Sequence, residues 1–309
     1  MATTEAPRWD RWSASQDGVG ENPVWDAAAE RLWWSDVVGP SVRWSAEAGA
    51  VPTSVAMPSD VATFALADGG AAVVVLVDGI HELRADGTLR RLLDAPYDRA
   101  QHRFNDGRCD TRGRLWIGSN RIPGSGAPRG SARFWRLDAA GLTPHMDGFS
   151  VSNGTAFSPE GDVMYAADSM SRSIVAFDYD LDTGTPSNRR VFATVEGSEG
   201  GTALPDGAAV DARGGYWIAV YGAGLVLRFA PDGRLDRVLR APVTHPTMVA
   251  FGGASGDRMF LTSGRAFASP EVLAAEPGAG DVYVADVGER GVPEHRFGFL
   301  DALRRASTL

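Results

Sequence analysis

The chain of 309 residues carries a formal net charge of −9 at pH 7, and its calculated isoelectric point is near 5.1. It has no basic stripe and no apolar run long enough to span a membrane, which argues against a nucleic-acid partner and against a membrane partner. Cys109 is its only cysteine and all 30 Lys or Arg positions are arginine, so an intrachain disulfide and lysine catalysis are excluded. Because residues 1–10 lack a secretion signal, we expect a cytoplasmic protein.

An apolar or aromatic run recurs six times along the chain, usually after a Gly/Asp turn. The runs occupy residues 31–36, 71–76, 114–118, 163–168, 215–220 and 258–262. Their central residues, 40 to 52 positions apart, are Trp33, Val73, Trp116, Tyr165, Trp217 and Phe260. A period of roughly 40–50 residues with several short strands per unit is typical of a β-propeller blade. The sequence therefore predicts an all-β, six-bladed β-propeller that forms a single domain over residues 1–309.

Further strands are expected after the central run of each repeat. Residues 79–84 lead through an Asp-Gly pair into residues 89–93, and Asp-Gly between alternating runs is a favoured hairpin turn. The last repeat continues through residues 281–285 and 288–291 to residues 293–297, and little chain remains after it. We expect residues 8–12, upstream of the first repeat, to supply the outer strand of the last blade. Such closure would remove exposed sheet edges.

Four repeats carry an oxygen-bearing side chain 11 or 12 residues before the central residue of the run. These side chains are Glu21, Asn105, Asn153 and Asp206. Equivalent positions in a closed ring of blades point at one axis, so the repeat predicts a common polar pocket. Repeats two and six carry Asp60 and Thr247 at what we take as the same register. Asn-Gly and Asp-Gly also suit simple turns, but their recurrence at one register favours a shared site.

The four axial side chains are an oxygen-only donor set of one glutamate, one aspartate and two asparagines. Carboxylate and amide oxygens suit hard divalent cations such as Ca²⁺, Mg²⁺ or Mn²⁺, whereas Zn²⁺ usually takes nitrogen or sulfur ligands. Two carboxylates would balance the charge of such an ion. Coordination positions would then stay open for water or substrate, as a catalytic metal requires.

Other catalytic groups receive less support from the sequence. No Gly-x-Ser-x-Gly motif follows a predicted strand, which argues against a serine hydrolase. Cys109 falls where the other repeats carry apolar residues, so we expect a core residue and not a nucleophile. His102 and His245 fall near the expected mouth of the pocket, and loop histidines are more often solvated than catalytic. Neither is given a role.

These segments resemble the gluconolactonase, regucalcin (senescence marker protein) and luciferin-regenerating-enzyme family of sugar lactonases over nearly the whole chain. The matching motifs are Gly20-Glu-x-Pro-x-Trp25, Arg103-x-Asn-Asp-Gly107, Ser152-Asn-Gly154, Pro205-Asp-Gly207 and Ala250-Phe-Gly-Gly253. The resemblance implies a six-bladed propeller with one divalent cation in its axial cleft. Carried over residue by residue, it implies that Glu21, Asn153 and Asp206 ligate the metal and that Arg103 and Asn105 contact the substrate. We expect Ca²⁺, with Zn²⁺, Mn²⁺ or Mg²⁺ as alternatives.

One segment departs from the family pattern. After residues 115–118 many relatives continue with Gly-Thr-Met and an acidic stretch that reaches the substrate's hydroxyls, whereas this chain has Arg121 where an acid is common. Arg103 is already one cation at the mouth, so a second one would favour an anionic substrate group such as the carboxylate of an aldarolactone. Two interpretations stay open: Arg121 binds substrate, or it points into solvent or pairs with a surface acid.

The sequence therefore predicts a divalent-metal-dependent sugar lactonase. Its substrate would be a gluconolactone-like aldonolactone, or a related pentonolactone or aldarolactone, opened to the free acid. The ring carbonyl would lie on the metal, and Asp206 is the candidate base for the attacking water. The alternative is a non-catalytic metal-binding or protein-interaction propeller. The concentration of polar side chains on the axis favours the enzyme, because a scaffold would show its diversity on outer loops.

Overall fold

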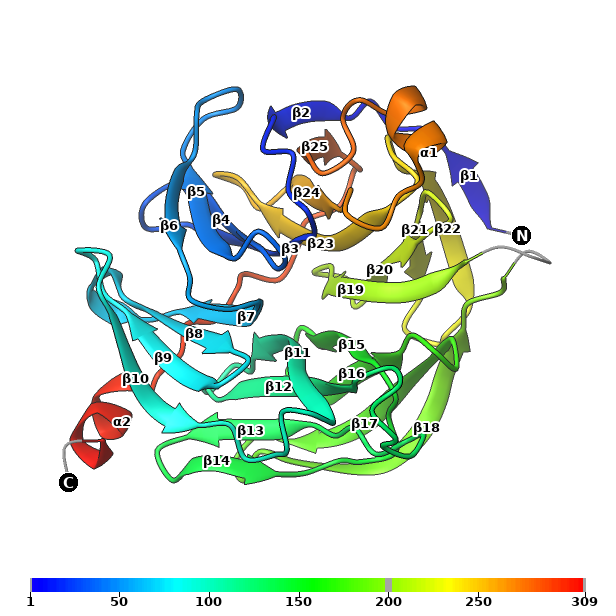
Figure 1. The fold of residues 1–309 in the computed structure, drawn as a ribbon. Helices are drawn as coiled ribbons and strands as arrows, with labels where there is room; N and C mark the ends of the chain where they lie inside the picture. The colour runs from blue at the N-terminus through cyan, green and yellow to red at the C-terminus, as the bar shows by residue number, and fades with distance from the viewer. Residues whose placement is uncertain (1, 198–201, 308–309) are drawn as a thin grey trace.

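The computed structural model describes residues 2–197 and 202–307, and its six sheets are arranged round a central axis like the blades of a propeller (Figure 1). Helical structure in these residues is confined to α1 (Pro270–Ala275), α2 (Leu300–Ala306) and a 3₁₀ turn at Asp68–Gly70. No helix in the described ranges is long and apolar enough to cross a membrane. The predicted all-β, six-bladed propeller is confirmed.

Each blade is a meander of antiparallel strands. Blade 1 comprises β3 (Gly20–Asp26), β4 (Arg31–Asp36), β5 (Ser41–Ser45) and β6 (Thr53–Ala56); blade 2 comprises β7 (Val61–Leu66), β8 (Ala72–Leu76), β9 (Gly79–Leu83) and β10 (Leu89–Asp94). Blade 3 comprises β11 (His102–Cys109), β12 (Leu115–Arg121), β13 (Trp135–Asp138) and β14 (Gly141–Pro144); blade 4 comprises β15 (Ser152–Phe157), β16 (Val163–Asp168), β17 (Ser173–Asp180) and β18 (Thr185–Thr194). Blade 5 comprises β19 (Leu204–Val210), β20 (Tyr216–Tyr221), β21 (Leu225–Phe229) and β22 (Leu235–Arg240); blade 6 comprises β23 (Pro246–Gly252), β24 (Arg258–Ser263) and β25 (Val282–Asp286).

The first strand of every blade faces the axis. Each of these inner strands contacts the inner strand of the next blade, from β3 through β7, β11, β15 and β19 to β23, and β23 contacts β3 again. Large apolar side chains fill the space between blades, among them the fully buried Trp34, Trp116 and Trp217. The apolar core therefore lies between the blades, which leaves the axis to the polar side chains of the inner strands.

The amino-terminal segment closes the ring. Strand β2 (Asp10–Ser13) pairs antiparallel with β25, so it is the outer strand of blade 6. This confirms the closure predicted for residues 8–12. Strand β1 (Thr3–Glu5) adds a fifth, parallel strand to blade 5 by pairing with β22. Closure with strands from both ends of the chain leaves no blade to fray at the junction.

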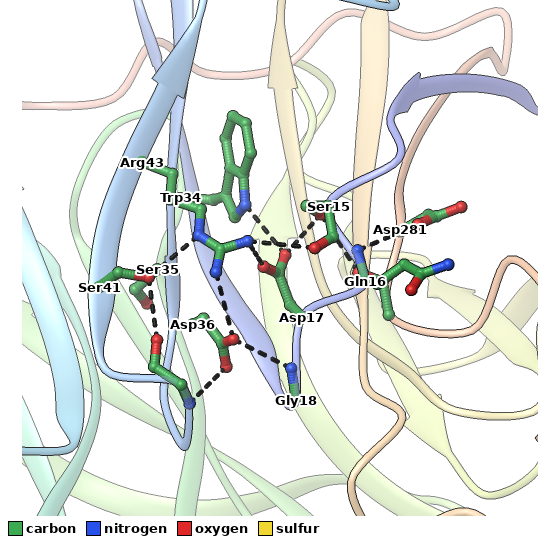
Figure 2. A network of polar contacts seen from close by, with 12 residues as sticks. Ser15, Gln16, Asp17, Gly18, Trp34, Ser35, Asp36, Ser41, Arg43 and Asp281 are labelled. Carbon is green, nitrogen blue, oxygen red and sulfur yellow. Dashed lines mark hydrogen bonds and ion pairs between the residues drawn. The ribbon is translucent and has the colours of Figure 1, made fainter. Parts of the chain in front are cut away.

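A buried polar network holds the link between β2 and β3 (Figure 2). The Asp17 carboxylate, on a residue with no exposed surface, accepts hydrogen bonds from Trp34 Nε1 at 3.0 Å and Ser15 Oγ at 2.7 Å. It also forms an ion pair with the guanidinium of Arg43. Its own backbone N–H donates to the Gly280 carbonyl at 2.6 Å. Asp17 thus joins the closing segment to both blade 1 and blade 6.

Cys109 lies in the apolar cluster between blades 2 and 3, and 4% of its surface is exposed. Burial raises the pKa of its thiol well above the ordinary value, and the neighbouring carboxylates of Asp110 and Glu294 add to the effect. The prediction of a core residue is confirmed. We expect a thiol reagent such as dithiobisnitrobenzoate to label the folded protein very slowly and to reach one label per chain in guanidinium chloride. Rapid labelling of the native protein would contradict this assignment.

The carboxyl-terminal residues 291–299, which we call the strap, run across the end of the axis at which the inner strands finish (red in Figure 1). Val292 N–H donates to the Val210 carbonyl at 3.1 Å and Phe297 N–H donates to the Leu66 carbonyl at 2.8 Å, so the strap joins blades 5 and 2. An ion pair between Glu294 and Arg108 fastens its middle to blade 3. The opposite end of the axis, where the inner strands begin, we call the entrance end.

Candidate active site

All six inner strands shift register with their neighbour near the same point. The shifts fall between Glu21 and Val24, Val61 and Thr63, Asn105 and Gly107, Asn153 and Ala156, Pro205 and Ala208, and Pro246 and Val249. A bulge bends a strand and redirects the adjacent side chains. The sixfold recurrence of this irregularity places an equivalent side chain of each blade at the axis.

The strand pairing identifies the members of this ring. In blades 1, 3 and 4 the residue beside the bulge comes directly after Gly20, Phe104 and Ser152 on the inner strand. These three residues pair with Asp36, Ser119 and Asp168 on the second strand of the blade. The equivalent pairs in blades 2, 5 and 6 are Val61↔Leu76, Pro205↔Val220 and Pro246↔Ser263. The ring therefore consists of Glu21, Ala62, Asn105, Asn153, Asp206 and Thr247.

The prediction that Asp60 shares the axial register is wrong, because Ala62 occupies that position. The error arises in residues 71–76, where an unbroken Ala/Val run provides no distinctive residue from which to count the register. Asp60 instead forms an ion pair with Arg103, with 3.4 Å between Oδ2 and Nη1, and both side chains are about two-fifths exposed. Asp60 is therefore a neighbour of Arg103 outside the ring.

The two carboxylates of the ring repel each other. Burial raises the pKa of Glu21 well above its usual value, and the nearby charges of Asp206 and Asp106 raise it further. Burial likewise raises the pKa of Asp206, with a second contribution from Asp106. Like charges close together in a poorly solvated site disfavour ionisation of both groups. A bound cation would favour the ionised form of both carboxyl groups, because its positive charge would offset this repulsion.

Asp106 is an axial carboxylate that the sequence pattern did not single out. It is 8% exposed, has a φ of +42°, and accepts hydrogen bonds from Thr155 N and Thr155 Oγ1, both at 2.9 Å. Burial raises its pKa, whereas the bonds from Thr155 lower it. The one signal in the sequence was its place in Asn105-Asp-Gly107, which also suits a turn. Because its carboxylate is hydrogen-bonded to Thr155 of blade 4, we assign Asp106 a structural role. Its negative charge adds to the electrostatic potential at the axis.

A chain of hydrogen bonds orients the Asn153 carboxamide. Asn105 Nδ2 donates to Asn153 Oδ1 at 2.8 Å and to the Ser152 carbonyl at 2.8 Å. Asn153 Nδ2 donates to Ser169 Oγ at 2.9 Å, and the Ser169 hydroxyl donates to the Pro205 carbonyl at 2.7 Å. Because Ser169 uses its proton on Pro205, it accepts from Asn153, which fixes the amide nitrogen away from Asn105. The network joins blades 3, 4 and 5, and Ser169 was not anticipated from the sequence.

The donor chemistry of the ring fits a hard divalent cation. No group of three His, Cys, Asp or Glu side chains within residues 2–197 and 202–307 is arranged to hold a metal ion. The predicted set does not need one, since its donors are two carboxylates and an amide oxygen. Such an ion would relieve the repulsion between the Glu21 and Asp206 carboxylates. It would also be coordinated by Oδ1 of Asn153, whose orientation the hydrogen bonds fix.

The predicted substrate residues all lie on β11 and β12 of blade 3, but Arg103 pairs with Asn120 and so leaves the opposite face of the sheet from Arg121. Arg103 lies on β11, and Arg121 is the last residue of β12, opposite His102. No ion pair joins Arg121 to an acid among the described residues, and its Nε is buried without a hydrogen-bond partner. Whether its guanidinium contacts substrate or points into solvent stays a prediction. His245, by contrast, packs against Tyr221, with ring centroids 4.7 Å apart, and burial lowers its pKa.

Comparisons with known proteins identify the family of this chain. A family model described as SMP-30/Gluconolactonase/LRE-like region matches residues 19–265. The chain is 36% identical to a 6-deoxy-6-sulfogluconolactonase of Pseudomonas putida over 282 residues, and 32% identical to regucalcin of Gallus gallus over 286 residues; each match covers 90% of this chain and 94% of the relative. A crystal structure of a calcium-binding protein, regucalcin, from Agrobacterium tumefaciens has a TM-score of 0.88 at 24% identity, covering 97% of this chain and 99% of that one. The chain belongs to the SMP-30/gluconolactonase/LRE-like family.

Proposed function

We propose that this protein is a divalent-metal-dependent lactonase that hydrolyses a sugar lactone to its open-chain acid. The observation that carries the proposal is the pairing of two mutually repelling axial carboxylates, Glu21 and Asp206, with the oriented amide of Asn153. Membership of a family that includes lactone hydrolases supports the reaction class, which is hydrolysis of a carboxylic ester. The bound ion would be Ca²⁺, in keeping with a structural neighbour described as calcium-binding, with Zn²⁺, Mn²⁺ and Mg²⁺ as alternatives.

Glu21, Asn153 and Asp206 would hold the cation through oxygen donors. The bound ion would supply Lewis-acid chemistry, which polarises a carbonyl group and lowers the pKa of water. Asp206 is the proposed base: its carboxylate would accept a proton from the attacking water, favoured by the neighbouring negative charge of Asp106. Ser169 would keep the Asn153 amide in its working orientation.

Arg103 and Asn105 would position the lactone. Asn105 already points its amide nitrogen toward Asn153 and therefore lies beside the proposed cation. The side chain of Arg103 is 41% exposed, and among the described residues its guanidinium pairs with Asp60 alone, at 3.4 Å, so it can turn to a substrate oxygen. Since the strap crosses the far end of the axis, we expect the lactone to enter from the entrance end.

The substrate class follows in part from the relative in Pseudomonas putida, whose name denotes a lactone of a six-carbon sugar acid. We propose an aldonolactone of this type, with pentonolactones and aldarolactones as the related candidates. The alternative is a scaffold, a metal-binding or protein-interaction propeller without catalysis. In that case the axial carboxylates would bind a cation, but the protein would hydrolyse no lactone.

A hydrolysis screen tests the proposed function. Purified protein should acidify weakly buffered solutions of five- and six-membered sugar lactones faster than spontaneous hydrolysis does. Treatment with a chelator such as EDTA should remove this activity because the carbonyl would lose its Lewis acid, and Ca²⁺, Mn²⁺, Mg²⁺ or Zn²⁺ added back singly should restore it. A pH-stat records the rate. Absence of hydrolysis for every lactone and every ion would favour the scaffold.

A further inference from the structure

The entrance end of blades 5 and 6 carries a pair of aromatic side chains. Tyr221 is the last residue of β20 and pairs with Leu204, the first residue of β19. His245 comes directly before the first residue of β23. The two ring centroids lie 4.7 Å apart, with an angle of 47° between the ring planes. Because the inner strands begin at the entrance end, both rings lie on the side of the axial ring from which we expect the lactone to enter.

The phenol of Tyr221 lies close to the carboxylate of Asp206, the proposed base. Burial raises the pKa of Tyr221 to about 12, and the negative charge of Asp206 contributes to the shift. Asp206 comes two positions after Leu204 on β19, which agrees with this electrostatic contact. The phenol stays protonated at physiological pH, so it can donate a hydrogen bond beside the proposed base but is not itself a base.

The hydroxyl of Tyr221 differs from those of four other tyrosines. Hydrogen bonds to the protein engage the hydroxyls of Tyr97, Tyr179, Tyr216 and Tyr283. The hydroxyl of Tyr221 forms none with the residues that the structure describes, and its side chain is only partly buried. Nδ1 of His245 is buried and also lacks a hydrogen-bond partner, so packing and not hydrogen bonding joins the two rings. The pair therefore offers aromatic surface and one unengaged hydroxyl at the entrance.

Blade 6 lies opposite blade 3 across the axis. The inner strands contact one another in the order β3, β7, β11, β15, β19 and β23, so β23 stands three positions from β11 in a ring of six (Figure 1). Arg103 comes two positions before the ring member Asn105. His245 likewise comes two positions before the ring member Thr247. A lactone on the entrance side of the ring would therefore have Arg103 on one side and the aromatic pair on the other.

We propose that Tyr221 is a substrate-binding residue, which packs its ring against a C–H face of the sugar lactone and donates its hydroxyl hydrogen to a sugar oxygen. His245 is a positioning residue, which holds the Tyr221 ring through their contact. This inference rests on the proposed lactonase function and narrows its substrate to a cyclic, hydroxylated lactone. A sugar ring carries C–H groups on its faces and hydroxyls round its edge, and an aromatic ring with a polar tip complements both.

Two six-membered lactones separate the ring contact from the hydroxyl contact: gluconolactone, which carries hydroxyls, and δ-valerolactone, which carries none. In Tyr221→Ala we expect KM for gluconolactone to rise about 10-fold and kcat/KM for δ-valerolactone to fall, since the ring contact is lost for both. In Tyr221→Phe, KM for gluconolactone should rise about 3-fold, while kcat/KM for δ-valerolactone should not change. In both variants kcat for gluconolactone should stay within about 2-fold, because contacts remote from the reacting carbonyl bind the ground state and the transition state equally.

Three further variants test the role of the pair. His245→Ala should raise KM for gluconolactone about 3-fold, and His245→Phe, which keeps a ring beside Tyr221, should restore it. The matched control is Tyr165→Phe, which removes a hydroxyl in the apolar cluster between blades 4 and 5 and should change neither KM nor kcat. The pH profile of kcat/KM should be the same in Tyr221→Phe and wild type, because the phenol is not a base.

Calorimetry with glucose, a six-membered sugar ring that the protein would not hydrolyse, provides a readout independent of activity. The affinity for glucose should fall about 10-fold in Tyr221→Ala and about 3-fold in Tyr221→Phe. Unchanged KM and glucose affinity in both variants, or a loss of kcat alone, would overturn the role of Tyr221 and leave the lactonase function standing.

Hydrolysis of no lactone would refute the proposed function, and the glucose affinities would still decide the role of Tyr221. Absence of glucose binding to a wild type that hydrolyses no lactone would refute both. If Tyr221→Ala does not fold, Tyr221→Phe decides the role of the hydroxyl, and His245→Ala with its rescue by His245→Phe decides the role of the ring.

Discussion

Asp206→Asn and Glu21→Gln should each lower kcat/KM for lactone hydrolysis by about 10²–10⁴-fold, the range expected when a positioned base or a metal ligand is lost. Both variants should also bind less divalent metal, measured by mass spectrometry of the dialysed protein. The fold should persist because these side chains lie on the axis, away from the apolar clusters between the blades. Without metal, either substitution removes one of two repelling carboxylates, so the melting temperature of the chelated variants should equal or exceed that of chelated wild type.

A control in the same blade as Asp206 is Asp232→Asn, which changes an exposed turn carboxylate that accepts a hydrogen bond from Arg234 N at 3.0 Å. Its rate and metal content should equal those of wild type. If Glu21→Gln or Asp206→Asn keeps normal metal content and a normal rate, the assignment of the axial ligands is wrong. A loss of rate with unchanged metal content in Asp206→Asn alone would identify Asp206 as the base and remove it from the ligand set.

Asp17→Ala should lower the free energy of unfolding by about 3 kcal/mol and the melting temperature by on the order of 5–10 °C. Removing the carboxylate leaves the Arg43 guanidinium, whose side chain is 18% exposed, with the longer contact to Asp36 at 3.5 Å as its ion pair among the described residues, beside neutral acceptors at Ser41 Oγ and the Ser15 carbonyl. Trp34 Nε1 also loses its acceptor in a fully buried position. An unpaired buried charge or donor costs more than the ion pair contributes. Denaturant unfolding followed by tryptophan fluorescence measures the change.

Asp10→Ala is the matched control, since its carboxylate forms an exposed pair with Arg8 and should contribute less than about 1 kcal/mol. Burial raises the pKa of Asp17 from its ordinary value of 3.8 to about 7, although the charge of Arg43 opposes the shift. The folded protein therefore binds this proton more tightly than the unfolded chain, so the contribution of Asp17 to stability falls as pH rises from about 4 to 7. Asp17→Ala should lack that pH dependence. Equal stability of Asp17→Ala and Asp10→Ala would show that the network does not hold the ring closed.

The sequence by itself determined the blade count and most of the axial ring, because a rotational repeat makes equal positions in the chain equal positions in space. Glu21, Asn105, Asn153, Asp206 and Thr247 all lie where the repeat predicts, beside the bulges of their inner strands. The closure by residues 8–12 could also be predicted from the sequence, since the last repeat lacks one strand and the segment before the first repeat can supply it. The extent of the chain as one domain stays a prediction from the sequence.

The tertiary structure alone decided which side chains meet across blades. Asp106 reaches Thr155, and Asn153 reaches Ser169, through hydrogen bonds whose partners no repeat relates. Asp60 does not belong to the ring, because the register of an apolar strand depends on its pairing and not on its composition. Arg121 and His102 are neighbours because β11 and β12 pair them directly, which a count along the chain does not show. Contacts between repeats are set by packing geometry, which the sequence of one repeat does not contain.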